Sequence, residues 1–312
     1  MRIVRDLSMI DPDTRGAVAA IGNFDGVHLG HQAVIDAAAQ VAVALDAPLG
    51  VMTFEPHPRN LFVPDAPPFR LMNAESRADR LARLGIDLLF EVPFNRDLVA
   101  LTPHDFARQI ICDGLGLRHV VVGTDFCFGK DRAGDAAALQ AFGTDMGFGV
   151  TVAPMVALDA GRVSSTAIRQ VLADGDPRAA ARMLGHWHRI AGPVQHGEKR
   201  GRDMGYPTAN LAMDGLHLPK LGVYAVLIDI ADGPQAGQYH GVASLGVRPM
   251  FGENQPNFET FIFDFDGDLY GQHISVALVE FLRPEVKFTT VDNLIAQMDA
   301  DSVQARDVLS NV

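Results

Sequence analysis

The sequence has little of several features that mark large classes of protein. Its 312 residues include only 2 cysteines and 1 tryptophan, and 38 acidic side chains outnumber 26 lysines and arginines. Two cysteines cannot form a disulfide framework or a thiolate metal site, and they are typical of a protein in a reducing cytosol. The net charge of −12 argues against a binder of nucleic acid or anionic membranes, because both partners require a basic surface.

Long apolar runs are also missing. No stretch approaches the length of a membrane span, and the first residues lack the apolar core of a secretory signal. Low-complexity segments and internal repeats are absent too. What the chain has is a hydrophobic fraction of 48% and enough length for one large or two ordinary domains. We therefore expect a cytoplasmic, globular protein without a membrane partner.

The first half of the chain alternates short apolar runs with amphipathic stretches. Strands are expected at residues 17–21, 49–54, 88–92, 119–122 and 150–153. This alternation predicts a parallel, doubly wound α/β sheet with helices between the strands. Thr102 and Asp176 each precede a proline, which predicts a capped helix start at both places.

The pattern changes near residue 186. From there to about residue 283, short strands are separated by Gly, Pro and Asp turns, and the clearest are expected at residues 222–230, 239–247, 258–263 and 273–282. Closely spaced strands without helices predict a small antiparallel barrel. Asp266-Gly267 indicates a hairpin, and Thr290 is placed to cap a terminal helix. The sequence thus predicts two domains, residues 1–185 and 186–312.

The strongest chemical signal is one ten-residue string, Gly22-Asn23-Phe24-Asp25-Gly26-Val27-His28-Leu29-Gly30-His31. It lies where a strand is expected to lead into a helix, which is where α/β proteins hold phosphates. Glycines let backbone amides approach an anion closely. Imidazoles at a helix N-terminus can donate to phosphate oxygens and stabilise charge that develops during transfer. The alternative is a Gly-rich turn with two incidental histidines, which the full string disfavours.

Three further strings follow other expected strands. They are F-E-P-H-P-R at residues 54–59, G-T-D-F-C-F-G-K-D-R-A-G-D at residues 123–135 and S-S-T-A-I-R at residues 164–169. In the last of these, hydroxyl side chains stand at a helix start with Arg169 one turn later. This arrangement suits a triphosphate, although an ordinary helix cap is the alternative. All three strings fall at the carboxyl ends of parallel strands, where open α/β sheets bind ligands.

These four strings, in this order, closely resemble the adenylyltransferase half of the bacterial bifunctional riboflavin kinase/FAD synthetases. That half is part of the wider H-x-G-H nucleotidyltransferase superfamily. The resemblance implies in-line attack by the FMN phosphate on the α-phosphate of ATP, with pyrophosphate leaving. It implies His28 and His31 as the catalytic side chains. The ATP- and phosphate-binding positions that it implies are Gly22, Phe24, Asp25, Gly26, Gly30, Asp125, Ser164, Ser165, Thr166 and Arg169.

A class I aminoacyl-tRNA synthetase also carries H-x-G-H, but the S-S-T-A-I-R string and the low basic content argue against that class.

The second half carries another strong string, G-R-D-M-G-Y-P-T-A-N at residues 201–210. The Thr208 hydroxyl and the Asn210 carbonyl are hard oxygen ligands suited to Mg²⁺, whereas an ordinary turn is the alternative. Together with S-L-G-V-R-P-M-F-G, E-T-F-I-F-D-F, D-L-Y-G and F-L-R-P further on, the string resembles the flavokinase domain, a small six-stranded barrel. Met250 departs from that family, which commonly has threonine after the proline.

The flavokinase resemblance implies Glu259 as the general base that takes the proton of the ribityl 5′-hydroxyl of riboflavin. It implies Thr208 and Asn210 as the residues that hold Mg²⁺. The ATP- or flavin-binding positions that it implies are Gly201, Gly205, Pro207, Thr208, Asn210 and Arg283. Asp264 and Asp266 are interpreted as hairpin residues rather than metal ligands.

The sequence therefore predicts a bifunctional enzyme that makes FMN from riboflavin and then FAD from FMN. ATP is consumed in both steps, ADP and pyrophosphate are released, and Mg²⁺ is required. A riboflavin kinase alone and a flavin-binding regulator with inactive sites are the alternatives, and the intact motifs disfavour both. No nucleic-acid partner is expected, and the sequence leaves the oligomeric state open.

Overall fold

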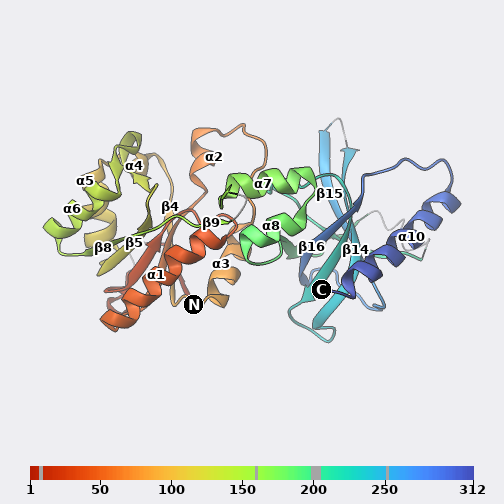
Figure 1. Cartoon of the computed structure of the whole chain (residues 1–312), viewed down its shortest axis with the longest axis horizontal. Coiled ribbons are helices and arrows are strands. Elements are labelled where there is room, and N and C mark those ends of the chain that lie inside the picture. Colours follow the sequence, from red (N-terminus) through yellow and green to blue (C-terminus); the bar gives the residue numbers. More distant parts are fainter. Residues whose placement is uncertain (7–9, 159–160, 198–204, 251–252) are drawn as a thin grey trace. The chain divides into compact units, whose positions relative to one another are not determined.

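The computed structural model describes residues 1–6, 10–158, 161–197, 205–250 and 253–312. The chain forms two compact units, Met1–Pro67 with Ala74–Ser164, and Pro68–Asn73 with Ser165–Val312 (Figure 1). Helices α7 (Ser165–Asp174) and α8 (Pro177–Leu184) belong to the second unit by this division. The domain boundary near residue 186 stays a prediction.

The first unit is built on a six-stranded parallel sheet. Its strands are β1 (Arg2–Val4), β2 (Val18–Ile21), β3 (Leu49–Glu55), β4 (Leu88–Pro93), β5 (His119–Gly123) and β8 (Gly149–Ala153). The order is β1-β4-β3-β2-β5-β8. From β2 the chain adds β3 and β4 on one side and then β5 and β8 on the other, so the doubly wound prediction is confirmed. Only β1 was not predicted among these strands.

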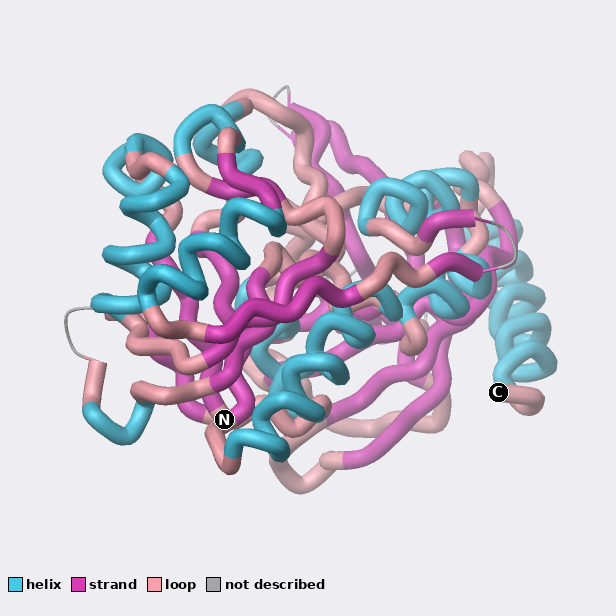
Figure 2. The backbone as a smooth tube through the Cα atoms, turned by 60° about the vertical axis from the view of Figure 1, so that its left-hand side comes forward, coloured by secondary structure: helices cyan, strands magenta, loops and turns pink. Residues whose placement is uncertain are grey.

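Helices cover both faces of this sheet (Figure 2). They are α1 (Leu29–Leu45), α2 (Pro58–Phe62), α3 (Ala74–Arg83), α4 (Arg96–Ala100), α5 (Pro103–Phe106) and α6 (Ala136–Met146). A π-helix, η3 (Ala107–Gly114), follows α5. Shorter elements are the 3-10 turns η2 (Pro12–Thr14) and η4 (Lys130–Arg132), and the strand pairs β6 (Cys127–Phe128) with β7 (Gly134–Asp135) and β9 (Ala157–Leu158) with β10 (Gly161–Arg162).

Local sequence sets several helix starts as expected. The Thr102 hydroxyl accepts the Asp105 N–H at 3.1 Å, and the Asp176 carboxylate accepts the Ala179 N–H at 2.8 Å. Each side chain satisfies a backbone donor that has no partner in the first helical turn. Between the helices and the sheet, Met52 and Phe90 pack with Phe106 and Ile111 in one apolar core.

The second unit is built on a six-stranded antiparallel sheet. Its strands are β11 (Arg189–Pro193), β12 (Thr208–Leu211), β13 (Gly222–Ile230), β14 (Gly237–Met250), β15 (Glu253–Ile262) and β16 (His273–Arg283). The order is β11-β16-β13-β14-β15-β12. A bridge between Gln195 and Asn210, with an N–H···O distance of 2.9 Å, joins the two ends of the sheet and curls it into a barrel.

The terminal helix α10 (Val291–Leu309) lies along the outside of this barrel (Figure 1). Thr290 caps it by accepting the Asn293 N–H at 3.2 Å, as expected. Ala305 and Leu309 pack against Ala225 and Val279 of the sheet. The barrel and its terminal helix were both predicted.

The predicted hairpin at Asp266-Gly267 is wrong. Strands β15 and β16 on either side of it are not neighbours, because β15 pairs with β14 and β12 while β16 pairs with β11 and β13. Long-range pairing therefore overrules the local turn signal. Asp264, expected in that hairpin, instead forms a two-bond ion pair with Arg306 of α10, at 2.8 and 2.9 Å.

Candidate active sites

The Gly22–His31 string forms a tightly coiled loop between β2 and α1. Phe24 and Val27 have positive φ angles of 50° and 41°, as does Gly26 at 90°. Such conformations are costly for residues with side chains and concentrate at functional sites. The Phe24 side chain is only 1% exposed, and the Gly22 N–H donates to the Met52 carbonyl at 3.1 Å. Packing and hydrogen bonds thus hold the loop in place.

The two histidines of this loop are stacked. Their ring centroids are 3.6 Å apart with 15° between the planes. His28 caps α1, because its Nδ1 accepts the His31 N–H at 3.2 Å. A Cβ on residue 30 would lie 3.1 Å from the His28 ring, so glycine at that position lets the ring lie close to the backbone.

The hydrogen bond at Nδ1 fixes which nitrogen of His28 carries the proton. When Nδ1 accepts, the proton of a neutral imidazole is on Nε2, which can then donate to an anion. Burial, and then the neighbouring charge of His28, lowers the pKa of His31 well below its usual value. His31 is therefore neutral near pH 7. The loop places two imidazoles at a helix N-terminus, where the backbone amides and the helix dipole favour phosphate.

Other predicted residues of the first site lie on neighbouring loops of the same unit. The Thr53 hydroxyl of β3 donates to the Asn23 carbonyl at 3.2 Å. Asp125, after β5, is exposed and forms an ion pair with Arg162. Ser164 follows Val163, whose carbonyl oxygen is 3.7 Å from the place a Cβ on Gly30 would take. Asp25 is buried in the first loop.

The remaining predicted residues of this site are on α7 of the second unit: Ser165, Thr166 and Arg169. The Arg169 Nε donates to the Phe69 carbonyl at 2.6 Å, and its guanidinium lies 5.5 Å from the Phe69 ring. These contacts hold α7 to the 68–73 segment. The phosphate-binding role of these three residues stays a prediction.

In the barrel, strand register brings the predicted kinase residues together. Asn210 of β12 lies directly opposite Glu259 of β15, and Thr208 lies opposite Phe261. Because side chains alternate along a strand, Thr208 and Asn210 share one face, while Ala209 between them is buried in the barrel core. The Glu259 carboxylate accepts a hydrogen bond from the Asn257 amide at 2.9 Å. A hydroxyl, an amide and a carboxylate thus converge on one face.

Gly197 lies close to the Asn210 side chain. A Cβ on residue 197 would lie 2.5 Å from the Asn210 Nδ2, so only glycine leaves that amide in place. Gly205 has a φ of 82°, and Pro207 precedes the strand. Gly201 lies outside the described residues.

Arg283 ends β16 with its guanidinium engaged by α10. Its Nε and one terminal nitrogen donate to the buried Asp301 carboxylate at 2.7–3.1 Å, and another nitrogen donates to the Pro284 carbonyl at 3.0 Å. A fork-to-carboxylate pair of this kind is directional and fixes the helix against the strand. The predicted contact of Arg283 with flavin or phosphate stays a prediction.

The donor set around Asn210 fits Mg²⁺ held together with a nucleotide. Mg²⁺ prefers oxygen ligands and is usually shared between one or two protein groups and substrate phosphates. Within the described ranges, no three His, Cys, Asp or Glu side chains are grouped as a metal cage would require. Thr208 and Asn210 are the side chains that would offer oxygen donors, and their role as ligands stays a prediction.

Sequence reasoning missed two residues that shape these sites. Neither Gly197 nor Asn257 is among the predicted site residues. The contact of Gly197 with Asn210 and that of Asn257 with Glu259 depend on strand register. No local pattern in the sequence reports that register.

A phosphate-binding α/β unit followed by a six-stranded barrel with an oxygen-rich face defines a two-domain, nucleotide-using transferase. The family described as FAD synthetase matches residues 10–167, and the family described as riboflavin kinase matches residues 184–309. The chain belongs to the family of bifunctional riboflavin kinase/FMN adenylyltransferases.

Two relatives of that name illustrate the similarity. The Pseudomonas fluorescens protein is 43% identical over 98% of this chain and 97% of its own, and the Escherichia coli K12 protein is 37% identical over the same shares. A crystal structure named as a macrolide-efflux protein from Streptococcus pneumoniae matches with a TM-score of 0.85 and 33% identity, covering 97% of this chain and 98% of that one. Among the described residues, no helix is both long and apolar enough to cross a membrane.

Proposed function

We propose that the parallel-sheet region and the barrel carry the two activities of the family, one each and in series. At the barrel, riboflavin and ATP give FMN and ADP. At the parallel sheet, FMN and a second ATP give FAD and pyrophosphate. The observation that carries the proposal is the match of both enzyme families, side by side, across one chain.

In the kinase step, Glu259 accepts the proton of the ribityl 5′-hydroxyl as the oxygen attacks the γ-phosphorus of ATP, and ADP leaves. The Asn257 amide orients that carboxylate, which supports direct proton transfer. Thr208 and Asn210 bind the nucleotide phosphates from the opposite strand of the same face. Mg²⁺, held by these two side chains, would neutralise phosphate charge as the bond to the leaving ADP breaks.

In the adenylyl-transfer step, a phosphate oxygen of FMN attacks the α-phosphorus of ATP, and pyrophosphate leaves. The His28 Nε2–H donates to a phosphate oxygen while its Nδ1 remains bonded to the start of α1. His31 keeps the His28 ring in orientation by stacking. No covalent intermediate is needed, so catalysis consists of positioning and charge stabilisation.

One assay tests the proposal and separates it from its alternatives. The protein is mixed with riboflavin, ATP and Mg²⁺, and the flavins are resolved by chromatography over time. We expect FMN to appear first and FAD to follow. Formation of FMN without FAD would indicate that the protein is a riboflavin kinase alone. Tight flavin binding without any product would indicate a flavin-binding regulator. Omitting Mg²⁺ should stop both products.

A further inference from the structure

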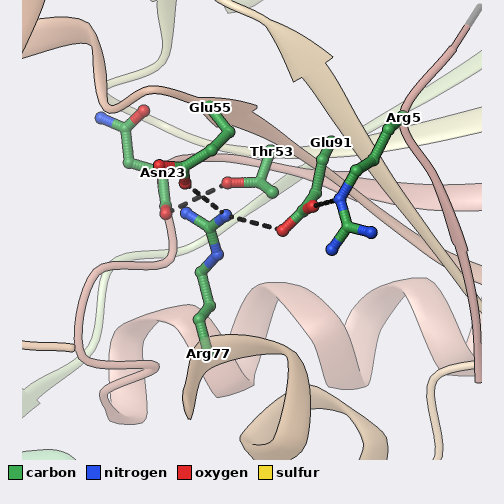
Figure 3. Close-up of polar contacts among 6 residues, drawn as sticks. All are labelled: Arg5, Asn23, Thr53, Glu55, Arg77 and Glu91. Atoms are coloured by element: carbon green, nitrogen blue, oxygen red, sulfur yellow. Dashed lines mark hydrogen bonds and ion pairs between the residues drawn. The ribbon is translucent and has the colours of Figure 1, made fainter. Parts of the chain in front are cut away.

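A buried arginine lies beneath the carboxyl ends of β3 and β4 in the first unit. Arg77 of α3 is 1% exposed, and one terminal nitrogen donates to Glu55 at 2.9 Å and to Glu91 at 3.2 Å (Figure 3). The Nε of Arg5 donates to the other oxygen of Glu91 at 2.7 Å. Two cations and two anions thus form one continuous chain of ion pairs.

This chain of ion pairs meets the first active site at the end of β3. Thr53 lies opposite Glu91 in the parallel register, and Glu55 shares its face because side chains alternate along a strand. The Thr53 hydroxyl holds the Asn23 carbonyl of the Gly22–His31 loop (Figure 3). Glu55 is the second residue of the F-E-P-H-P-R motif. The end of β3 therefore leads into this motif loop and also contacts the Gly22–His31 loop, which follows β2.

Stability alone does not account for charges at this place. On the same face, Val51 and Leu89 are apolar and fully buried. Replacing a buried ion pair by packed apolar residues is often neutral or stabilising. A buried ion pair can instead fix the orientation of the segments that carry its charges, because its hydrogen bonds are directional. The loop that follows Glu55 has its own ordered contact, since the His57 Nδ1 accepts the Arg59 N–H at 3.2 Å to cap α2.

We propose that Arg77 is a positioning residue for adenylyl transfer. By holding Glu55 against Glu91, it sets where the second motif loop leaves β3 relative to the Gly22–His31 loop. The role rests on the proposed activity of the first unit. A lysine at residue 77 keeps the charge, but its ammonium sits on a shorter and more flexible stem than the guanidinium nitrogen that bonds both carboxylates.

The test compares three variants of the full chain. Arg77→Lys should lower kcat for FAD formation from FMN and ATP about tenfold, because small displacements of an aligned site are costly. Glu55→Gln weakens the same contact from its partly exposed end and should lower kcat in the same direction. Arg5→Gln is the matched control, since it removes the far ion pair of Glu91 without touching Glu55. It should leave kcat within twofold. Riboflavin phosphorylation should stay unchanged in all three.

Hydrogen exchange gives a readout besides activity. The amides of Arg59 and Asn60, which bond to His57, should exchange faster in Arg77→Lys and Glu55→Gln but not in Arg5→Gln. If Arg5→Gln lowers FAD formation as much as the other two, or if exchange at these amides is unaltered in Arg77→Lys and Glu55→Gln, the positioning role is overturned. If the unaltered chain makes no FAD, the proposed function itself fails.

Discussion

The two proposed sites differ in the groups that they would offer to phosphate. The first has loop amides, a helix N-terminus and two stacked imidazoles, and burial lowers the pKa of His31. The second presents oxygen ligands and a carboxylate, Glu259, from facing strands. A carboxylate repels phosphate unless a cation intervenes, so the proposed barrel site would need Mg²⁺ between them. The first unit already provides donors for the phosphate.

The largest effect that tests this contrast is at the barrel. Glu259→Gln keeps the size of the side chain but removes the proton acceptor, so riboflavin phosphorylation should fall by about 10²–10⁴-fold. FAD formation from supplied FMN should persist, which chromatography of the flavins checks. Loss of FAD formation as well would show that the two sites are coupled.

The corresponding change in the first unit is His28→Asn. Asparagine is a good helix cap, so the start of α1 keeps a side-chain acceptor while the imidazole donor is lost. FAD formation should fall by about 10²–10³-fold, the range for removing one preorganised donor, and riboflavin phosphorylation should stay intact. His28→Ala removes the helix cap as well, so the difference in thermal unfolding between His28→Ala and His28→Asn measures the contribution of the cap to stability. A wild-type rate of FAD formation in His28→Asn would exclude His28 as a phosphate donor.

Both units contain a buried histidine whose titration affects stability. Burial, followed by the charges of His217 and His186, lowers the pKa of His188 to about 3. Because the unfolded chain takes up a proton near pH 6.5 and the folded one does not, stability is present above pH 6.5 and is lost on acidification. Between pH 6.5 and 5, His188 should cost the second unit about 2 kcal/mol of unfolding free energy. The lowered pKa of His31 acts in the same direction on the first unit.

Urea unfolding at pH 7 and pH 5 checks this expectation. His188→Gln should weaken the pH dependence of the second unit and leave that of the first unaltered. Equal pH dependence in the variant and the unaltered chain would contradict it.

Sequence patterns located the candidate site residues of the first unit better than those of the barrel, and the reason is physical. In the first unit, a βα loop is a local structure, so the residues of the Gly22–His31 string that lie together in space also lie together in the chain. In the barrel, Asn210 and Glu259 meet only through the pairing of β12 with β15. The prediction of a hairpin at Asp266-Gly267 failed for the same reason, because β16 pairs with β11 and β13, which are distant in the sequence, and not with β15. The resemblance to a known family, rather than periodicity, supplied Glu259.

Arg77 shows a second limit. It lies on a strongly polar helix, A-E-S-R-A-D-R-L-A-R, where Arg83 is exposed and Arg77 is buried. Helical spacing places Arg77 on the face of Ala78 and Leu81, but nothing in that segment indicates that its partners are Glu55 and Glu91. The positions of its partners on β3 and β4 are needed, and these follow from the sheet.

The smallest predicted effect tests the barrel site at Gly197, a residue that only the structure identifies as close to Asn210. Gly197→Ala would place a Cβ 2.5 Å from the Asn210 Nδ2, so the amide must shift from its position opposite Glu259. We expect the KM for ATP in riboflavin phosphorylation to rise about tenfold, the loss of roughly one good hydrogen bond. FAD formation from FMN should be unaltered.

Gly192→Ala is the matched control, because a Cβ at residue 192 of β11 meets no atom within 4 Å. It adds the same methyl group to the same barrel and should leave the KM for ATP unchanged. Equal KM values for ATP in the two variants would contradict the role of Asn210 in binding the nucleotide. A rise confined to Gly197→Ala would instead show that the barrel holds ATP through a side chain fixed by strand register, in contrast to the first unit, where a continuous loop and a helix N-terminus offer the donors.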